Sequence, residues 1–335
     1  MSVAAASSPS SPGPAVEPVR DPVWEPDVLL AGHEATPLGP ATLVRRAERP
    51  AEPRGVVLHV HGYNDYYFQE HLTAALTVQG FACYAVDLRR AGRSVLREPE
   101  GAGGLPPHFA TSLGEFGADL DAAAAAVRRA EPGLPLAVHA HSTGGLTASV
   151  WASVTSGAGP DALVLDSPFL DLTGSWLARQ VNLGVVGVLG RVRPMKVVSA
   201  HPSVYATFQH RLYGGRWDFD VRLKRPDGQP VRAAWLRTVR RAHVRVARGL
   251  GLTCPVLVAR SARSGPDSPD NPSLDAQDTV LDTRLIGAVA PRLGADVHQL
   301  VVPDGVHDLC LSAPGPRETY LAGVGDFLRT RMAPR

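Results

Sequence analysis

The segment Leu136-Ala-Val-His-Ala-His-Ser-Thr-Gly-Gly145 is the most informative part of this 335-residue sequence. A short, mainly apolar run typical of a buried parallel strand leads directly into Ser142, and two glycines then open a helical pattern. Small residues around a serine allow a sharp turn from strand to helix, which raises the hydroxyl above the sheet. The usual spacing is G-x-S-x-G, and Ala140 replaces the first glycine. The sequence therefore predicts a nucleophile at Ser142; the alternative is a Ser/Gly turn without chemistry.

A second serine has the same spacing in a different context. Ala110-Thr-Ser112-Leu-Gly114 follows Pro106-Pro107, and no strand precedes it. Because the turn needs a strand before the serine and a helix after it, we do not expect Ser112 to be a nucleophile.

Apolar runs recur along the chain and predict a sheet. The predicted buried strands are 55–61, 82–88, 135–141, 162–166, 255–259 and 297–302. Runs at 27–31 and 41–44 predict an antiparallel hairpin that begins the sheet. Helical patterns separate most strands, at 116–127, 146–154, 285–293 and 321–328. This alternation predicts an α/β fold with a mostly parallel, doubly wound sheet.

One segment interrupts the alternation and divides the chain. Residues 170–250 hold aromatic, Gly and Arg residues but no clear strand-helix unit, so we predict a cap inserted between two core strands. The predicted organisation is a disordered tail at 1–22, a core formed by 23–169 and 251–335, and the cap at 170–250.

A serine hydroxyl is a weak nucleophile near neutral pH and needs a positioned base. His307 lies just past the last predicted strand and follows Ser142 in the chain, so we predict that it is this base. His61 and His141 flank the predicted site. We predict that they contact the substrate, together with Trp176 of the cap.

The acid that would orient His307 is chosen among several aspartates. Asp278 immediately precedes the helical pattern at 285–293, which places it across one helix and one strand from His307. There it could orient the imidazole and stabilise its cationic form, so we predict Asp278. Asp282 and Asp166 are the alternatives, and the other role open to Asp278 is a plain helix N-cap.

Two backbone amides are candidates for stabilising the developing oxyanion. The strand at 55–61 ends in His61-Gly62-Tyr63, and a turn there can direct the Tyr63 amide at the site. The amide of Thr143, which follows the nucleophile, is the predicted second donor.

Together these residues resemble the α/β-hydrolases, in particular the lidded serine hydrolases that include monoacylglycerol lipases, lysophospholipases and related esterases. The resemblance runs from about residue 28 to 328. It rests on His61-Gly62, Asp87-Leu-Arg-Arg-Ala-Gly92-Arg-Ser94, Ala140-His-Ser142-Thr-Gly144, Asp278 and His307-Asp308. It implies an α/β-hydrolase fold, the roles given above, and a structural loop at 87–94. The departures are Ala140 and a long polar loop at 261–277.

The predicted reaction is hydrolysis of a small-molecule carboxylic ester through an acyl-enzyme, without cofactor or metal. Apolar cap residues from Trp176 to Leu189 favour a hydrophobic or lipid-like acyl group, although they could equally pack the cap on the core. The same triad could act on a peptide or a lactone, or transfer an acyl group. A non-catalytic binding module is the alternative from another class, and intact Ser142 and His307 argue against it.

Composition excludes several other classes. The 34 basic and 32 acidic residues leave a net charge of +2, which provides no large field for nucleic acid. Because there is no run of 18 apolar residues, we expect no transmembrane helix. Cys83, Cys254 and Cys310 match no zinc or redox spacing. We expect reduced core thiols, which favour the cytoplasm.

Overall fold

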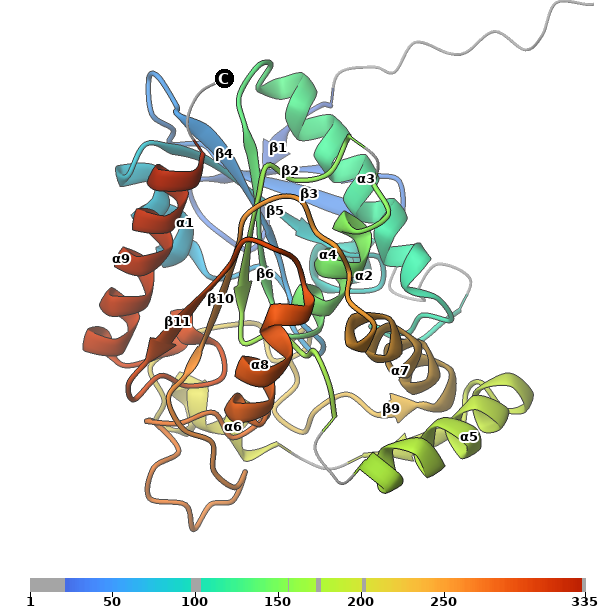
Figure 1. Ribbon diagram of the computed structural model, residues 1–335. Coiled ribbons are helices and arrows are strands. Elements are labelled where there is room, and N and C mark those ends of the chain that lie inside the picture. The colour runs from blue at the N-terminus through green and yellow to red at the C-terminus, as the bar shows by residue number, and fades with distance from the viewer. Residues whose placement is uncertain (1–21, 98–103, 156, 173–175, 201–202, 333–335) are drawn as a thin grey trace, which may run out of the picture.

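The computed structural model describes residues 22–97, 104–155, 157–172, 176–200 and 203–332, with side chains between 176 and 192 described from residue 184 onward. A nine-stranded sheet crosses the molecule in the order β1-β2-β3-β5-β4-β6-β7-β10-β11 (Figure 1). The strands are β1 Glu25–Pro26, β2 His33–Leu38, β3 Ala41–Arg46, β4 Gly55–Val60, β5 Phe81–Asp87, β6 Leu136–His141, β7 Ala162–Asp166, β10 Val256–Ser261 and β11 Val297–Val302. From β5 to β11 all neighbours are parallel, which confirms the predicted mostly parallel sheet.

The antiparallel start of the sheet corrects one prediction. A hairpin does begin the sheet, but its strands are β2 and β3, and the run at 27–31 is not a strand. The Asp27 carboxylate accepts a hydrogen bond from the Leu30 amide, which bends this run into a turn. Strand β2 was not predicted because its two buried residues, His33 and Thr36, are polar and lie on opposite faces of the strand.

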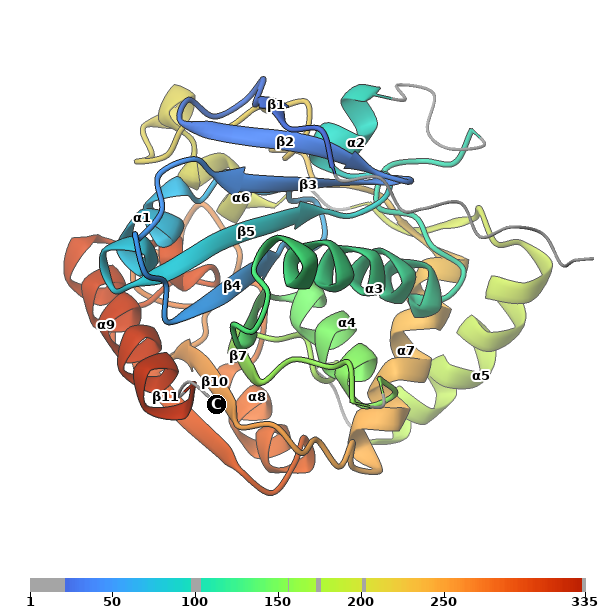
Figure 2. The same ribbon diagram turned by 90° about the horizontal axis from the view of Figure 1, so that it is seen from above.

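Helices cover both faces of the sheet (Figure 2). One face carries α3 Leu113–Ala130, α4 Thr143–Ala152 and α8 Thr283–Val289, and the other carries α1 Glu70–Val78 and α9 Pro314–Arg331. Alternate residues of β4 therefore pack into different cores: Val56 and Leu58 face α3 and α4, whereas Val57 faces α1 and α9. A short helix, α2 Gly92–Arg97, follows β5.

The serine that we did not expect to be a nucleophile begins a helix. Ser112 caps α3: its hydroxyl accepts a hydrogen bond from the Gly114 amide at 3.1 Å, and the Glu115 carboxylate returns to the Ser112 amide. This reciprocal arrangement is a capping box.

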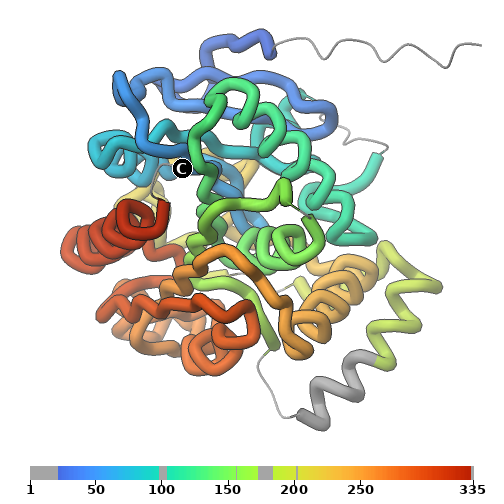
Figure 3. The backbone as a smooth tube through the Cα atoms, turned by 45° about the horizontal axis from the view of Figure 1, so that its top comes forward, coloured from blue at the N-terminus to red at the C-terminus, as the bar shows by residue number. Residues whose placement is uncertain are grey.

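The chain between β7 and β10, which are neighbours in the sheet, forms a separate set of elements. They are α5 Trp176–Val192, β8 Val197–Ser199, α6 Val204–Gln209, a 3₁₀ turn at Arg211–Tyr213, β9 Val231–Arg232 and α7 Ala233–Ala247. α5 and α7 lie side by side (Figure 3). This insertion falls within the range predicted for the cap. Of the predicted tail, residues 1–21 lie outside the part that the structure describes.

Cys83, Cys254 and Cys310 are free thiols; Cys83 and Cys310 are buried and Cys254 is half-buried. Among the helices that the structure describes, none combines the length and apolar character needed to cross a bilayer.

Candidate active site

Ser142 occupies a strained turn between β6 and α4. Its backbone has φ 52° and ψ −118°, which a non-glycine residue adopts only when its surroundings hold it there. A Cβ added to Gly144 would lie 2.3 Å from the His61 carbonyl oxygen, so only glycine allows α4 to begin so close to the end of β4. Ala140 is fully buried two residues before Ser142, which shows that a methyl group fits where the usual pattern has glycine.

Three side chains from distant parts of the chain meet at this turn. His307 Nε2 lies 3.0 Å from Ser142 Oγ, and His307 Nδ1 lies 3.0 Å from Asp278 Oδ2. His307 is in the loop after β11, and all three side chains are buried or nearly so. With Nδ1–H donated to Asp278, Nε2 can accept the Ser142 hydroxyl proton.

The second oxygen of Asp278 holds its own loop. Oδ1 accepts hydrogen bonds from the amides of Val280 and Leu281, both at 2.8 Å. These bonds fix the position of the carboxylate beside the His307 ring.

The alternative acids have other partners. Asp282 is the N-cap of α8 and accepts a hydrogen bond from the Arg284 amide at 2.9 Å. Asp166 is fully buried and accepts from the Leu309 amide. Burial and the nearby Asp308 charge raise the pKa of Asp166 well above its ordinary value, which disfavours the charged carboxylate that a triad acid needs.

The turn that follows β4 lies against the serine. A Cβ added to Gly62 would be 3.1 Å from Ser142 Cβ, so this glycine also allows a close approach. Tyr63 and Thr143, the two predicted oxyanion donors, line the same cavity as Ser142.

This cavity has a volume of about 340 Å³ and contains Ser142 and His307 in its wall. Its apolar lining comes from Phe169, Leu172, Ala206, Val231, Trp235, Val280 and Leu281. Its charged and polar lining includes Asp65, His141, Lys224 and Tyr205. A larger hollow of about 630 Å³ between α3, α4 and α7 is lined by neither Ser142 nor His307.

The predicted substrate contacts have different outcomes. His141 lines the cavity, and its ring centroid lies 4.8 Å from that of His307. Burial and the neighbouring His307 lower the pKa of His141 to about 3, so its ring is neutral. His61 is not among the cavity residues: its Nδ1 bonds the Gly62 carbonyl and its Nε2 accepts from the Leu88 amide. Its predicted contact with substrate therefore gains no support, because both ring nitrogens hold the backbone.

The predicted acyl contacts of the insertion also change. The Trp176 side chain lies outside the described residues. Of the predicted residues whose side chains are described, Val185 is 62% exposed, and none of Val185, Val186 and Leu189 lines the cavity. Their helix, α5, packs on α7. The described apolar lining comes from α6, β9, α7 and the loops after β7 and before α8.

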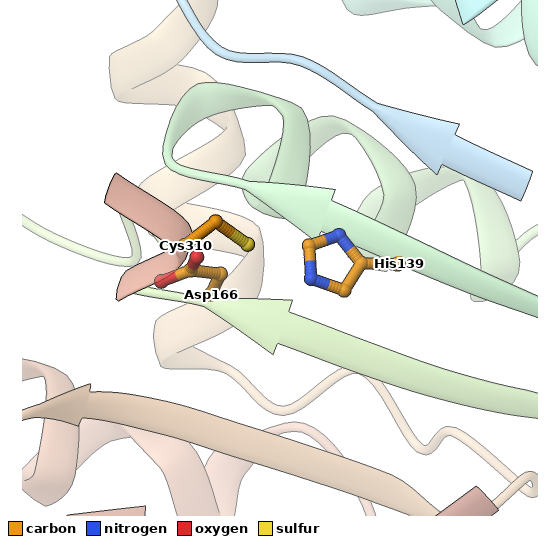
Figure 4. A group of neighbouring side chains, drawn as sticks. All are labelled: His139, Asp166 and Cys310. Carbon is orange, nitrogen blue, oxygen red and sulfur yellow. The ribbon is translucent and has the colours of Figure 1, made fainter. Parts of the chain in front are cut away.

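A layer of buried polar side chains lies under the site. His139, Asp166 and Cys310 bring possible ligand atoms within 4.8 Å of one another (Figure 4). However, His139 Nδ1 lies 2.9 Å from His59 Nδ1, and His139 Nε2 lies 2.6 Å from the Tyr320 hydroxyl. Burial also raises the pKa of the Cys310 thiol, whereas a metal needs the thiolate. We therefore assign no metal to these residues.

The loop at 87–94 is structural, as expected. The Asp87 carboxylate accepts from the Tyr67 and Arg93 amides, and it also pairs with the Arg93 guanidinium at 2.8 Å. Arg89 pairs with Asp119 of α3. These contacts fix the loop to its neighbours, so we assign Asp87 and Arg89 no role in the reaction.

Three side chains near the site were not predicted. Tyr205 of α6 accepts a hydrogen bond from the Asp308 amide at 2.9 Å, and its ring centroid lies 5.9 Å from that of His307. Lys224 Nζ lies 2.9 Å from Asp65 Oδ1. Burial alone would raise the pKa of Asp65, but the Lys224 charge lowers it to about 2. A signal for Lys224 was available, since Lys196 and Lys224 are the only lysines in a chain with 34 basic residues.

A mostly parallel sheet flanked by helices, with a serine at the β6–α4 turn and a histidine after β11, defines the α/β-hydrolase fold. The Hydrolase_4 family model, described as serine aminopeptidase S33, matches residues 51–226. This is more than half of the chain, and the chain belongs to this family.

Solved structures agree with this fold. A soluble variant of monoglyceride lipase from Saccharomyces cerevisiae is 15% identical, with a TM-score of 0.65 over 97% of this chain and 99% of that chain. Monoacylglycerol lipase from Paleococcus ferrophilus is 17% identical, with a TM-score of 0.61 over 84% and 97%. A carboxyl esterase from Bacillus coagulans is 16% identical, with a TM-score of 0.61 over 90% and 98%. No curated protein matches the chain.

Proposed function

We propose that this protein is a serine hydrolase that cleaves carboxylic esters through an acyl-enzyme. The observation that carries the proposal is the alignment of Ser142, His307 and Asp278, with two consecutive contacts of 3.0 Å. The similar solved structures include lipases and an esterase, which favours an ester as the substrate.

In the proposed cycle, His307 Nε2 takes the Ser142 proton as Oγ attacks the acyl carbonyl. The Tyr63 and Thr143 amides stabilise the oxyanion, and Asp278 stabilises the imidazolium. His307 then protonates the leaving alcohol, which leaves an ester between Ser142 and the acyl group. In the second half, His307 activates a water that hydrolyses this ester and restores the serine.

We propose a hydrophobic acyl group because apolar atoms contribute most of the described surface that lines the cavity. Phe169, Leu172 and Val231 line the same cavity as the serine, and its volume of about 340 Å³ suits a small ligand. The insertion supplies part of this lining, so we propose that residues 170–250 act as a cap that selects the acyl group.

The test is hydrolysis of p-nitrophenyl esters from acetate to dodecanoate by three proteins: wild type, Ser142→Ala and Ser112→Ala. Ser112 is the matched control because it has the same local spacing but caps α3. We expect Ser142→Ala to lose at least about 10³-fold in kcat, and Ser112→Ala to retain the wild-type value. We expect kcat/KM to rise with acyl length. Equal activity of Ser142→Ala would contradict the triad, and a preference for acetate would contradict the apolar acyl site.

The family description raises aminopeptidase activity as an alternative, which the same proteins test. Cleavage of aminoacyl p-nitroanilides without cleavage of esters would replace our proposal with a peptidase.

A further inference from the structure

Consecutive residues of the turn that follows β4 bind the inserted segment. The Asn64 amide group donates to the Arg225 carbonyl at 2.8 Å and accepts from the Arg225 amide at 3.0 Å. The side-chain hydroxyl of Tyr63, the residue before Asn64, donates to the Pro230 carbonyl at 3.0 Å. Hence the residue that supplies the proposed oxyanion amide also binds the cap through its side chain.

The next residue of the turn adds a buried ion pair. Lys224 Nζ lies 2.9 Å from Asp65 Oδ1, and the two side chains are 6% and 2% exposed. The rings of Phe68 and Phe219 lie 5.4 Å and 5.8 Å from the same ammonium. A buried pair is costly to break, because either partner alone would leave an uncompensated charge. The ion pair therefore fixes the distance between the turn and the insertion.

The backbone of the turn is itself strained. Asn64 has φ 54°, a left-handed conformation that its two bonds to Arg225 help to hold. We name the contacts of Tyr63, Asn64 and Asp65 with residues 224–230 the clasp. The chain just after the ion pair, at Gly228, Gln229 and Val231, lines the cavity that contains Ser142.

We infer that Asn64, Asp65 and Lys224 are positioning residues that hold the Tyr63 amide in place for the oxyanion. A substrate that fills the cavity touches the segment at 228–231, and the clasp transmits this contact to the turn. Contacts made by the cap thus affect kcat as well as binding. This inference rests on the proposed function, because it takes the Tyr63 amide as an oxyanion donor.

The test compares Asn64→Gly with a matched control in the full-length protein. Glycine keeps the left-handed backbone but removes both bonds to Arg225. The control is Arg216→Gln, which removes another contact between insertion and core, the exposed Arg216–Asp275 pair. Loss of an oxyanion donor costs about 10²–10³ in kcat, so we expect a misplaced donor to cost about 10–10².

The decisive readout is how this loss is divided between kcat and KM, measured with p-nitrophenyl acetate and octanoate. For Asn64→Gly we expect kcat to fall by the same factor on both esters while KM stays within about twofold. We expect Arg216→Gln to change neither. An unchanged kcat would overturn the inference, and so would a loss confined to KM that grows with acyl length, which would mean that the clasp only shapes the acyl site.

A second variant keeps the test valid if Asn64→Gly does not fold. Asp65→Asn combined with Lys224→Met removes the ion pair without leaving a buried charge, and we expect the same fall in kcat. A folded double variant with wild-type kcat would overturn the inference.

If the wild-type protein hydrolyses no ester, the proposed function fails and this inference fails with it. If the wild-type protein is active and the variants are unaffected, only the inference about the clasp is contradicted.

Discussion

Asp278 shows how one carboxylate serves two purposes. Its Oδ1 accepts hydrogen bonds from two loop amides, and its Oδ2 accepts from His307, so the loop bonds hold the oxygen that contacts the proposed base. Asp282 lies four residues on and also borders the cavity, but its carboxylate caps α8. The two aspartates therefore form a matched pair for mutation.

We expect Asp278→Asn to reduce kcat by about 10³–10⁴-fold, because an amide in this position no longer stabilises the imidazolium or fixes the productive tautomer. Asp282→Asn should keep nearly all activity, since asparagine also caps helices well. Steady-state kinetics on one p-nitrophenyl ester measures both. A larger loss of kcat in Asp282→Asn than in Asp278→Asn would indicate that Asp282 is the acid.

The sequence predicted residues that belong to a motif or that follow a known order along the chain. It missed residues that have neither signal. Ser142 follows from its spacing, and His307 from its place after the last strand. Lys224 meets Asp65 across 159 residues through an irregular part of the insertion, and no periodicity indicates that pairing.

Among the elements, the β6–α4 turn is the one that the chemistry depends on most. Its geometry requires the start of α4 to pass the end of β4 at a distance that only glycine allows. The strand and helix on either side were predictable because each has a clear apolar period. The helices α1 and α2 were not predicted, and β2 was missed because its two buried residues are polar.

We expect Gly144→Ala to abolish esterase activity, because a Cβ there would lie 2.3 Å from the His61 carbonyl oxygen and would push the turn away from β4. Ala140→Gly is the control at the other end of the motif and should keep activity. Both are measured by ester hydrolysis, with circular dichroism to check that the sheet and helices persist. Full activity of Gly144→Ala would mean that the close approach is not needed.

The start of α3 gives a prediction about stability alone. Ser112→Ala removes the hydroxyl that accepts from the Gly114 amide, and loss of such a cap costs about 1 kcal/mol in the free energy of unfolding. Urea denaturation measures this change. A change near zero would contradict the assigned capping role.

In the part of the molecule that the structure describes, burial keeps several histidines neutral. Burial is the largest cause that lowers the pKa of His139 and His243 to about 4, and of His108 and His141 to about 3. Composition indicated the number of histidines, but their burial on strands and under the insertion depends on tertiary packing.

These shifts predict that the protein loses stability in mild acid. Unfolded histidines titrate near pH 6.5, so between about pH 6.5 and 4 the unfolded state binds more protons than the folded state. Asp166 acts in the opposite direction because its folded pKa is raised, but it contributes one proton against several. The free energy of unfolding should therefore decrease as the pH is lowered, by up to about 1.4 kcal/mol per pH unit for each such histidine. Urea denaturation at pH 7, 6 and 5 measures it, and equal stability at all three would contradict the assignment.

We expect this fold to activate Ser142 as a nucleophile, and intact mass after treatment with a fluorophosphonate checks this claim. We expect a single covalent adduct on the wild-type protein and on Ser112→Ala, and none on Ser142→Ala. An unmodified wild-type protein, or an equal adduct on Ser142→Ala, would contradict the claim.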